Sequence, residues 1–286
     1  MRQSIYIVAP LVGLMALGAC SQSGEAEVNR AIQEAASVDD SNINDIFMSV
    51  ADPAESVAYF SRSLTQNPQS LELRRGLATS YTRGQRQSEA VTAWEEVVAH
   101  PDVTNEDRIS LAGAYIRANR WDDAEVTLDS VPPTHETFER YRLEAVIADG
   151  NEEWDKADSF YEIALGLTTQ RAGVLNNWGF SKLTRGDYAE AERLFTDAVR
   201  ADPGMFTAKN NLVLARGAQR NYELPVVPMT QIERAQLLHT MALTAIKQSD
   251  VSTGRGLLED AIATHPRHFE EAVRALRALN DGSAVN

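Results

Sequence analysis

The sequence predicts an all-α fold: a solenoid (a right-handed superhelix of stacked helical hairpins) with about six hairpins and a C-terminal capping helix. The main observation is a repeat of small residues, because Ala90, Ala124, Ala157 and Ala191 follow one another at intervals of 34, 33 and 34 residues. A period in this range is typical of stacked helical hairpins. No long segment alternates as a strand does. Hydrophobic residues make up 43% and charged residues 24% of the 286 residues, which suits a folded chain.

The first twenty residues are predicted to be a secretion signal that ends at a lipidation site. Arg2 precedes an apolar run of 13 residues, Ile5 to Leu17, whereas a membrane-spanning helix needs about 20. The run ends in Leu17-Gly18-Ala19-Cys20, which resembles the lipobox of bacterial lipoproteins, and Cys20 is the only cysteine. The resemblance implies that the chain is cleaved before Cys20 and that its thiol takes a diacylglyceryl group. The alternative is an ordinary signal peptide in which this cysteine is incidental.

The predicted localisation depends on the residue that follows Cys20. In many enteric-type bacteria an Asp at that place retains a lipoprotein in the inner membrane, and here the residue is Ser21. By that resemblance we expect a lipid-anchored outer-membrane protein that faces the periplasm. The predicted parts of the chain are a lipoprotein signal peptide at 1–19, a lipidated N-terminus and tether at 20–38, the solenoid at 39–280 and a flexible tail at 281–286.

Four regular copies of one pattern lie between residues 71 and 203, after an irregular hairpin at residues 41–68 with a turn at Asp52-Pro53. The clearest copy carries Leu175, Trp178, Gly179, Gly186, Tyr188, Ala191, Phe195, Ala198 and Pro203. These residues and spacings resemble the tetratricopeptide repeat (TPR), a pair of antiparallel helices. Lys182 is a departure, because that pattern usually has tyrosine there. The resemblance implies that each hairpin buries its apolar face by stacking on the next.

Packing explains why these residue types recur. Small residues such as Gly179 and Ala191 let two helices approach closely, and a large residue such as Phe195 fills the space between adjacent hairpins. Gly and Asn between the helices allow the left-handed turn that ends the first helix. The tryptophans fall on core positions of the repeats, so they are predicted to be packing residues.

The period is interrupted once, near residues 221–229. Ala208 to Gln219 fits a first helix, but two prolines then rule out a continuous helix, so we expect an extended crossover. The pattern resumes from Leu238 to Pro266. A final helix from Phe269 to Leu279 is expected to cover the last exposed face of the core.

Charge and residue patterns exclude several classes of function. Asp plus Glu number 41 against 27 Lys plus Arg, and the net charge of −14 argues against a nucleic-acid partner, which needs a basic surface. The lone cysteine excludes an intrachain disulfide and a zinc knuckle. No motif of a nucleotide-binding site, a hydrolase or a metalloprotease is present. We therefore expect no enzyme activity, no metal or cofactor and no small-molecule substrate.

A TPR array implies a concave groove lined by the first helices, in which a partner would lie. In the two most regular adjacent copies the residues expected there are Asn176, Asn177, Phe180, Asn210, Asn211 and Leu214. Such amides can hydrogen-bond an extended peptide, because each offers donors and an acceptor. The alternative is that Asn177 and Asn211 are consensus residues satisfied within the repeat. Arg142, with Arg75 and Arg117, could attract an acidic tail to this face or could be solvated.

A lipobox followed by such an array resembles the periplasm-facing TPR lipoproteins of secretion and pilus machines, and most of all the TadD-like proteins of the tight-adherence (Flp/Tad) pilus system. The resemblance rests on residues 174–180, 185–192 and 208–215, with Trp178 in place of the more usual leucine. It implies a non-catalytic scaffold, a pilotin or assembly factor that binds the outer-membrane secretin or other pilus or secretion components. The alternative is a periplasmic adaptor that recruits cell-wall hydrolases or other envelope proteins.

Overall fold

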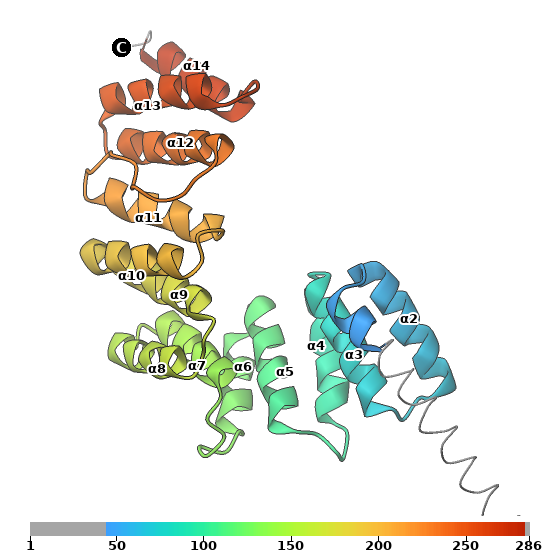
Figure 1. The fold of residues 1–286 in the computed structure, drawn as a ribbon. Helices are drawn as coiled ribbons and strands as arrows, with labels where there is room; N and C mark the ends of the chain where they lie inside the picture. The colour runs from blue at the N-terminus through green and yellow to red at the C-terminus, as the bar shows by residue number, and fades with distance from the viewer. Residues whose placement is uncertain (1–43, 284–286) are drawn as a thin grey trace, which may run out of the picture. The chain divides into compact units, whose positions relative to one another are not determined.

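The computed structural model describes residues 44–283, and every regular element among them is a helix (Figure 1). The predicted all-α fold is thus confirmed for this part of the chain. The helices group into two compact units, which divide between Asp107 and Arg108, and each unit is described by itself. The predicted signal peptide, the tether and Cys20 lie outside the described residues, so the predictions made for them stay predictions.

The first unit contains the irregular hairpin and the first regular one. Residues 44–49 are helical, and the carboxylate of Asp52 then caps the first turn of the next helix, so the predicted turn is confirmed. The helices that follow are α2 (Pro53–Gln66), α3 (Leu71–Arg83) and α4 (Gln87–Val98). Phe60 of α2 is fully buried and lies so close to α3 that a Cβ on Gly76 would sit 2.3 Å from its ring.

The second unit begins within α5 and holds the rest of the array. Its helices are α5 (Asn105–Arg117), α6 (Trp121–Asp129), α7 (Phe138–Gly150), α8 (Trp154–Gly166), α9 (Arg171–Thr184), α10 (Tyr188–Ala201), α11 (Phe206–Ala218), α12 (Gln231–Lys247), α13 (Val251–Thr264) and α14 (Glu270–Ser283). Helices α7 and α8, α9 and α10, and α12 and α13 form hairpins, and α10, α11 and α12 stack in order (Figure 1). Helix α14 packs on α13 and continues beyond Leu279, so residues 281–283 of the predicted tail are helical.

The turns that end the first helices share one backbone conformation. The residues with positive φ are Gln85, Asn119, Glu152, Gly186, Arg220 and Ser249, with φ between 55° and 85°. The left-handed turn expected between the helices is therefore present, but only Asn119 and Gly186 are of the expected types. At the other positions a Cβ disfavours this conformation, so the packing of the helices on both sides holds it.

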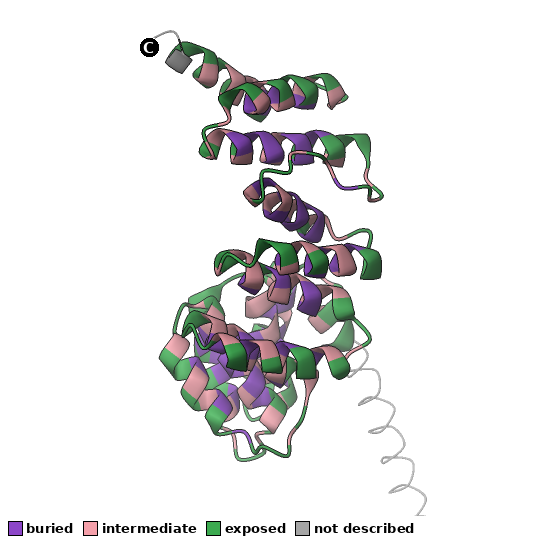
Figure 2. Ribbon diagram, turned by 90° about the vertical axis from the view of Figure 1, so that its left-hand side faces the viewer, coloured by how far each residue is buried: buried purple, intermediate pink, exposed green. Residues whose placement is uncertain are grey.

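Small residues meet large residues between the packed helices, as the spacing predicts. The four alanines that define the period are at most 2% exposed, and Figure 2 shows buried residues along the faces that the stacked helices share. A Cβ on Gly179 would lie 2.7 Å from the ring of Phe195, which is fully buried. The ring of Trp178 stacks on Tyr161 with centroids 6.1 Å apart. The close approach of Gly179 to Phe195 joins the two helices of one hairpin, and the stacked rings of Trp178 and Tyr161 join α9 to α8.

The predicted crossover takes the place of a second helix after α11. Between Ala218 and Gln231 the chain has no helix. Val227 packs against buried residues of α9, α10 and α11, and Leu224 packs against the core around α11, α12 and α13. Val226 between them is fully exposed. An extended segment with some side chains turned inward therefore covers the apolar face of α11, and the stack continues into α12.

Candidate functional site

The candidate groove lies on the first helices α9, α11 and α12 of the second unit. Helix α9 contacts α11, and α11 contacts α12. The structure therefore brings the predicted residues onto neighbouring helices. Helix α9 carries Asn176, Asn177 and Phe180, and α11 carries Asn210, Asn211 and Leu214.

Two side-chain hydrogen bonds connect these three helices. Asn211 donates from Nδ2 to Oδ1 of Asn176 at 3.0 Å, which links α11 to α9. Thr240 of α12 donates from Oγ1 to Oδ1 of Asn210 at 2.8 Å, which links α12 to α11. Asn211 is only 8% exposed. Three of the four predicted asparagines thus have a hydrogen bond within the fold, and the partner of Asn211 lies in the preceding repeat and not in its own.

The asparagines still offer hydrogen-bonding groups to a ligand. Asn176, Asn177 and Asn210 are partly exposed, and no further side-chain hydrogen bond engages them among residues 44–283. Because an amide carries two N–H donors besides its oxygen, the Nδ2 groups of Asn176 and Asn210 can donate to the backbone carbonyls of an extended chain. The part of these amides in partner binding stays a prediction.

Exposed apolar side chains follow the asparagines by one helical turn. Phe180 lies four residues after Asn176, and Leu214 lies four residues after Asn210, so each shares a helix face with its amide. Phe180 is 51% exposed, and Leu214 is partly exposed. Leu243, which is 45% exposed, takes the same place on α12. Helices α9 and α11 therefore each present an apolar side chain beside an amide, and α12 presents Leu243 near Thr240. A contiguous apolar patch on such a face would mark an interaction surface.

Thr240 and Leu243 were missed by the sequence analysis. The crossover is shorter than the helix that it replaces, so equivalent positions of α11 and α12 are fewer than 34 residues apart. A search at the 34-residue period therefore misses these two residues. The signal that finds them is the repeat pattern that resumes at Leu238, which places Thr240 and Leu243 on the first helix of the next hairpin.

The arginines predicted beside the groove are held by neighbouring groups. Arg142 forms an ion pair with Glu139 at 2.8 Å. In the first unit, Arg75 donates to both carboxylate oxygens of Asp107 at 2.7 and 2.6 Å. Burial lowers the pKa of Arg117, and the nearby charge of Arg142 lowers it further. Attraction of an acidic tail by these residues stays a prediction.

Two departures from the usual repeat pattern share one partner. Trp178 donates from Nε1 to Asp158 at 2.6 Å, and the Nζ atom of Lys182 lies 2.9 Å from the other carboxylate oxygen. Arg185 binds the same carboxylate. Burial alone would raise the pKa of Asp158, but the hydrogen bonds from Arg185 and Lys182 hold it below its ordinary value. Trp178 and Lys182 therefore link α9 to α8 through Asp158. This contact explains why tryptophan replaces the usual leucine and lysine replaces the usual tyrosine in this repeat.

Residues 44–283 show no arrangement for metal binding, because no group of three or more His, Cys, Asp or Glu side chains in this range could hold an ion. Within the same range no helix is long and apolar enough to cross a bilayer. The polar clusters that do occur join neighbouring helices, as Asp158 does.

Similarity to known proteins agrees with this geometry. A family model described as Tetratricopeptide repeat matches residues 45–104 and 177–224. A chain of the APC/C hetero-tetramer Cut9–Hcn1 superposes with a TM-score of 0.61 at 13% identity, over 82% of this chain and about half (48%) of that one. A tetratricopeptide repeat protein from Parabacteroides merdae superposes with a TM-score of 0.56 at 12% identity, over 83% of this chain and 96% of its own. No curated protein sequence matches significantly.

Antiparallel helix pairs that stack at a regular period define a helical-repeat protein. The fold is a TPR solenoid with an additional C-terminal helix, and the tetratricopeptide-repeat model matches two parts of it. At identities this low, the likeness to solved structures shows the fold alone. No catalytic family is indicated, and TPR repeats indicate a scaffold for protein–protein interaction.

Proposed function

We propose that this chain is a non-catalytic scaffold, anchored in the outer membrane through lipidated Cys20 and facing the periplasm, that binds protein partners during assembly of a tight-adherence (Flp) pilus or a related secretion machine. The observation that carries the proposal is the face of α9, α11 and α12, where the exposed side chains of Phe180 and Leu243 lie on helices joined through amides. The lipobox-like end of the apolar run supports the anchor. The resemblance of residues 174–215 to TadD-like proteins supports a part in pilus or secretion assembly.

An extended segment of the partner would lie along this face. Its backbone carbonyls would accept hydrogen bonds from Nδ2 of Asn176 and Asn210, and its apolar side chains would pack on Phe180, Leu214 and Leu243. Because the oxygens of the two amides are already held within the fold, the donors are oriented before the partner arrives. Such preorganisation reduces the entropy lost on binding.

The test is genetic, in the bacterium that carries the gene. Deletion should leave the secretin unassembled or mislocalised and should abolish piliation. The wild-type chain should restore both, whereas Cys20→Ser, and Phe180→Ser combined with Leu243→Ser, should not. The matched control is Ile163→Ser with Val251→Ser, which changes two apolar residues of the second helices α8 and α13 that are 41% and 40% exposed.

Normal secretin multimers and normal piliation in the deletion strain would contradict the proposal. If pili are unaffected and the tagged chain retains cell-wall hydrolases, the adaptor function takes its place. If Cys20→Ser fails to restore assembly but Phe180→Ser with Leu243→Ser succeeds, the anchor is needed and the groove is not, because Cys20→Ser keeps the binding face unchanged.

A further inference from the structure

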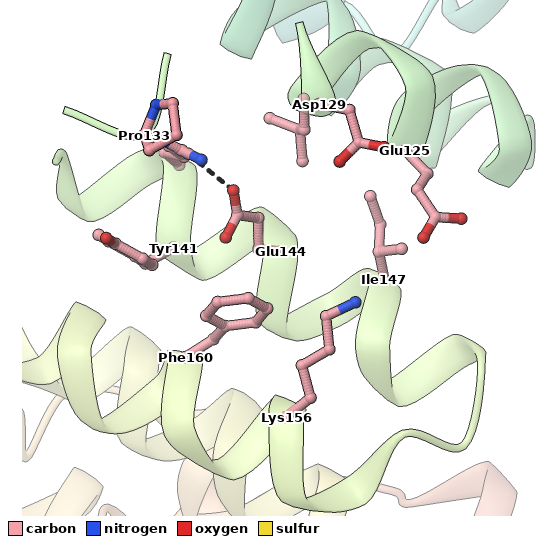
Figure 3. Close-up of a pocket in the computed structure, with 10 residues that line it drawn as sticks. Glu125, Asp129, Pro133, Tyr141, Glu144, Ile147, Lys156 and Phe160 are labelled. Carbon is pink, nitrogen blue, oxygen red and sulfur yellow. Dashed lines mark hydrogen bonds and ion pairs between the residues drawn. The ribbon is translucent and has the colours of Figure 1, made fainter. Parts of the chain in front are cut away.

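The second unit also holds a pocket away from the candidate groove (Figure 3). Its volume is about 300 Å³, and α6, α7 and α8 line it. On α7 the lining residues Tyr141, Glu144 and Ile147 recur every three residues, so they share one side of the helix. Arg142, the groove residue on this helix, is two residues from Glu144 and therefore lies on the opposite side. The pocket and the groove share no residue.

The floor of the pocket is apolar and aromatic. Leu128 of α6 and Ile147 of α7 are buried, at 2% and 6% exposure. The rings of Tyr141 and Phe160 are partly exposed, and their centroids lie 5.9 Å apart. Figure 3 shows both rings at the same side of the opening, one from α7 and one from α8. Such a floor suits a flat cationic group, because the face of an aromatic ring attracts positive charge.

Two acidic residues of α6 line the same pocket. Glu125 and Asp129 are four residues apart and so share one face of α6. Both extend from α6 toward the pocket in Figure 3. Neither forms a hydrogen bond or an ion pair with another residue in the described part of the chain. The third carboxylate, Glu144, differs because it bonds to Arg140 at 2.7 Å.

Two cations of the chain already line the pocket, Arg140 and Lys156. The guanidinium carbon of Arg140 lies 5.7 Å from the ring centroid of Tyr141. The Nζ atom of Lys156 is 2.8 Å from Glu153 and 6.0 Å from the ring centroid of Phe160. The hydrogen bond to Glu153 raises the pKa of Lys156, and the charges of Glu125 and Asp129 add to this effect. Three acidic residues (Glu125, Asp129 and Glu144) and two basic ones (Arg140 and Lys156) line the pocket, so negative charge is in excess there.

We propose that this pocket binds an arginine side chain of a protein partner, as a second docking site outside the groove. The guanidinium would lie against the ring of Phe160 and donate to Glu125 and Asp129, while its methylene groups contact Leu128. Arginine fits better than lysine, because its planar fork can donate to two carboxylates at once and can stack on a ring. The inference rests on the proposed function only in taking the ligand to be part of a protein.

The test is direct binding of a short Gly/Ser peptide with one central arginine to the purified full chain, followed by ligand-observed NMR. We expect a dissociation constant of about 0.1–1 mM, since a single side chain is bound. Glu125→Gln with Asp129→Asn should weaken binding about tenfold, because both acceptors lose their charge. Lys156→Gln should strengthen binding about threefold, because a competing positive charge is removed.

A matched control removes the same charge elsewhere. Glu259→Gln with Asp260→Asn changes two exposed acids of α13 and should leave the affinity unchanged. Phe180→Ser with Leu243→Ser should also leave it unchanged, so failure of the pocket and failure of the groove are distinguishable. Circular dichroism of each variant should show full helicity, because Glu125 and Asp129 make no bond that the fold would lose.

A second peptide tests the charge of the ligand. Citrulline in place of arginine keeps the shape without the charge, and that peptide should bind at least about tenfold more weakly. The proposal is overturned if the arginine peptide does not bind, if the citrulline peptide binds equally well, or if Lys156→Gln weakens binding. Free arginine amide that binds as tightly as the peptide would overturn the assignment to a protein partner.

Discussion

Asn177 and Asn211 occupy equivalent positions one repeat apart, yet their surroundings differ. Asn211 is 8% exposed and donates to Asn176, whereas Asn177 is partly exposed and has no side-chain hydrogen bond among the residues described. The loss of a hydrogen bond costs most when the partner is left buried and unpaired. The same residue type in the same repeat position is therefore structural in one copy and available to a ligand in the other.

Alanine substitutions separate these two roles. Asn211→Ala should lower the free energy of unfolding by about 0.5–1.5 kcal/mol, because it removes the hydrogen bond that the buried amide donates to Asn176. Asn177→Ala should change it by less than about 0.5 kcal/mol while weakening partner binding. Urea unfolding followed by circular dichroism measures both changes. Equal losses of stability in the two variants would mean that both amides are structural.

The ion pair of the first unit predicts a dependence on pH. Burial alone would raise the pKa of Asp107, but hydrogen bonds from Arg75 and Thr104 hold it below its ordinary value. Stability from such a carboxylate is present above its unfolded pKa of about 4 and is lost as pH falls through the lower folded pKa. Asp107→Asn should cost about 1–3 kcal/mol at neutral pH and flatten the loss of stability below about pH 4. Parallel stability curves for the two proteins would contradict this assignment.

The first helices end alike although their sequences differ. A residue with positive φ follows α3, α5, α7, α9, α11 and α12. Its type varies from Gly186 to Glu152 and Arg220, so the conformation is set by helix packing and not by local preference. Helix α11 keeps this ending although a crossover follows it. The hairpin turn is therefore a property of the first helix and its stacking.

Relief of this strain should stabilise the fold. Gln85 has a φ of 55° and is exposed, so Gln85→Gly removes the steric cost of its Cβ and no contact in the core. We expect a gain of about 0.5–1 kcal/mol in the free energy of unfolding. Gly186→Ala, at a φ of 85°, should cost a similar amount. Urea unfolding tests both, and a loss of stability in Gln85→Gly would be the contrary result.

Two glycines of α9 give a matched test of repeat packing. A Cβ on Gly179 would lie 2.7 Å from the Phe195 ring, whereas one on Gly173 would meet nothing within 4 Å. Gly179→Ala should therefore destabilise the protein by about 1–3 kcal/mol. Gly173→Ala should be neutral or stabilise it by up to about 1 kcal/mol, since alanine is the better helix former. Thermal unfolding distinguishes the two, and equal effects would mean that the close approach does not govern the position.

Over the whole molecule, the sequence predicts the array more completely than it predicts the binding surfaces. The period from Ala90 to Ala191 is visible because close helix packing demands small residues at one spacing. The prolines predict the crossover, but not that Leu224 and Val227 turn inward, since an aperiodic segment has no pattern that assigns its faces. Glu125 and Asp129 read as ordinary solvated acids in the sequence. Only the approach of α6, α7 and α8 brings them to one pocket with two aromatic rings.

The central claim is that the face of α9, α11 and α12 holds a protein partner. Affinity capture from detergent-solubilised envelopes, quantified by mass spectrometry, tests it most directly. The wild-type chain and the Ile163→Ser, Val251→Ser control should retain the same secretin or pilus component, and Phe180→Ser with Leu243→Ser should retain at least about tenfold less of it. Equal retention by all three proteins would contradict the account.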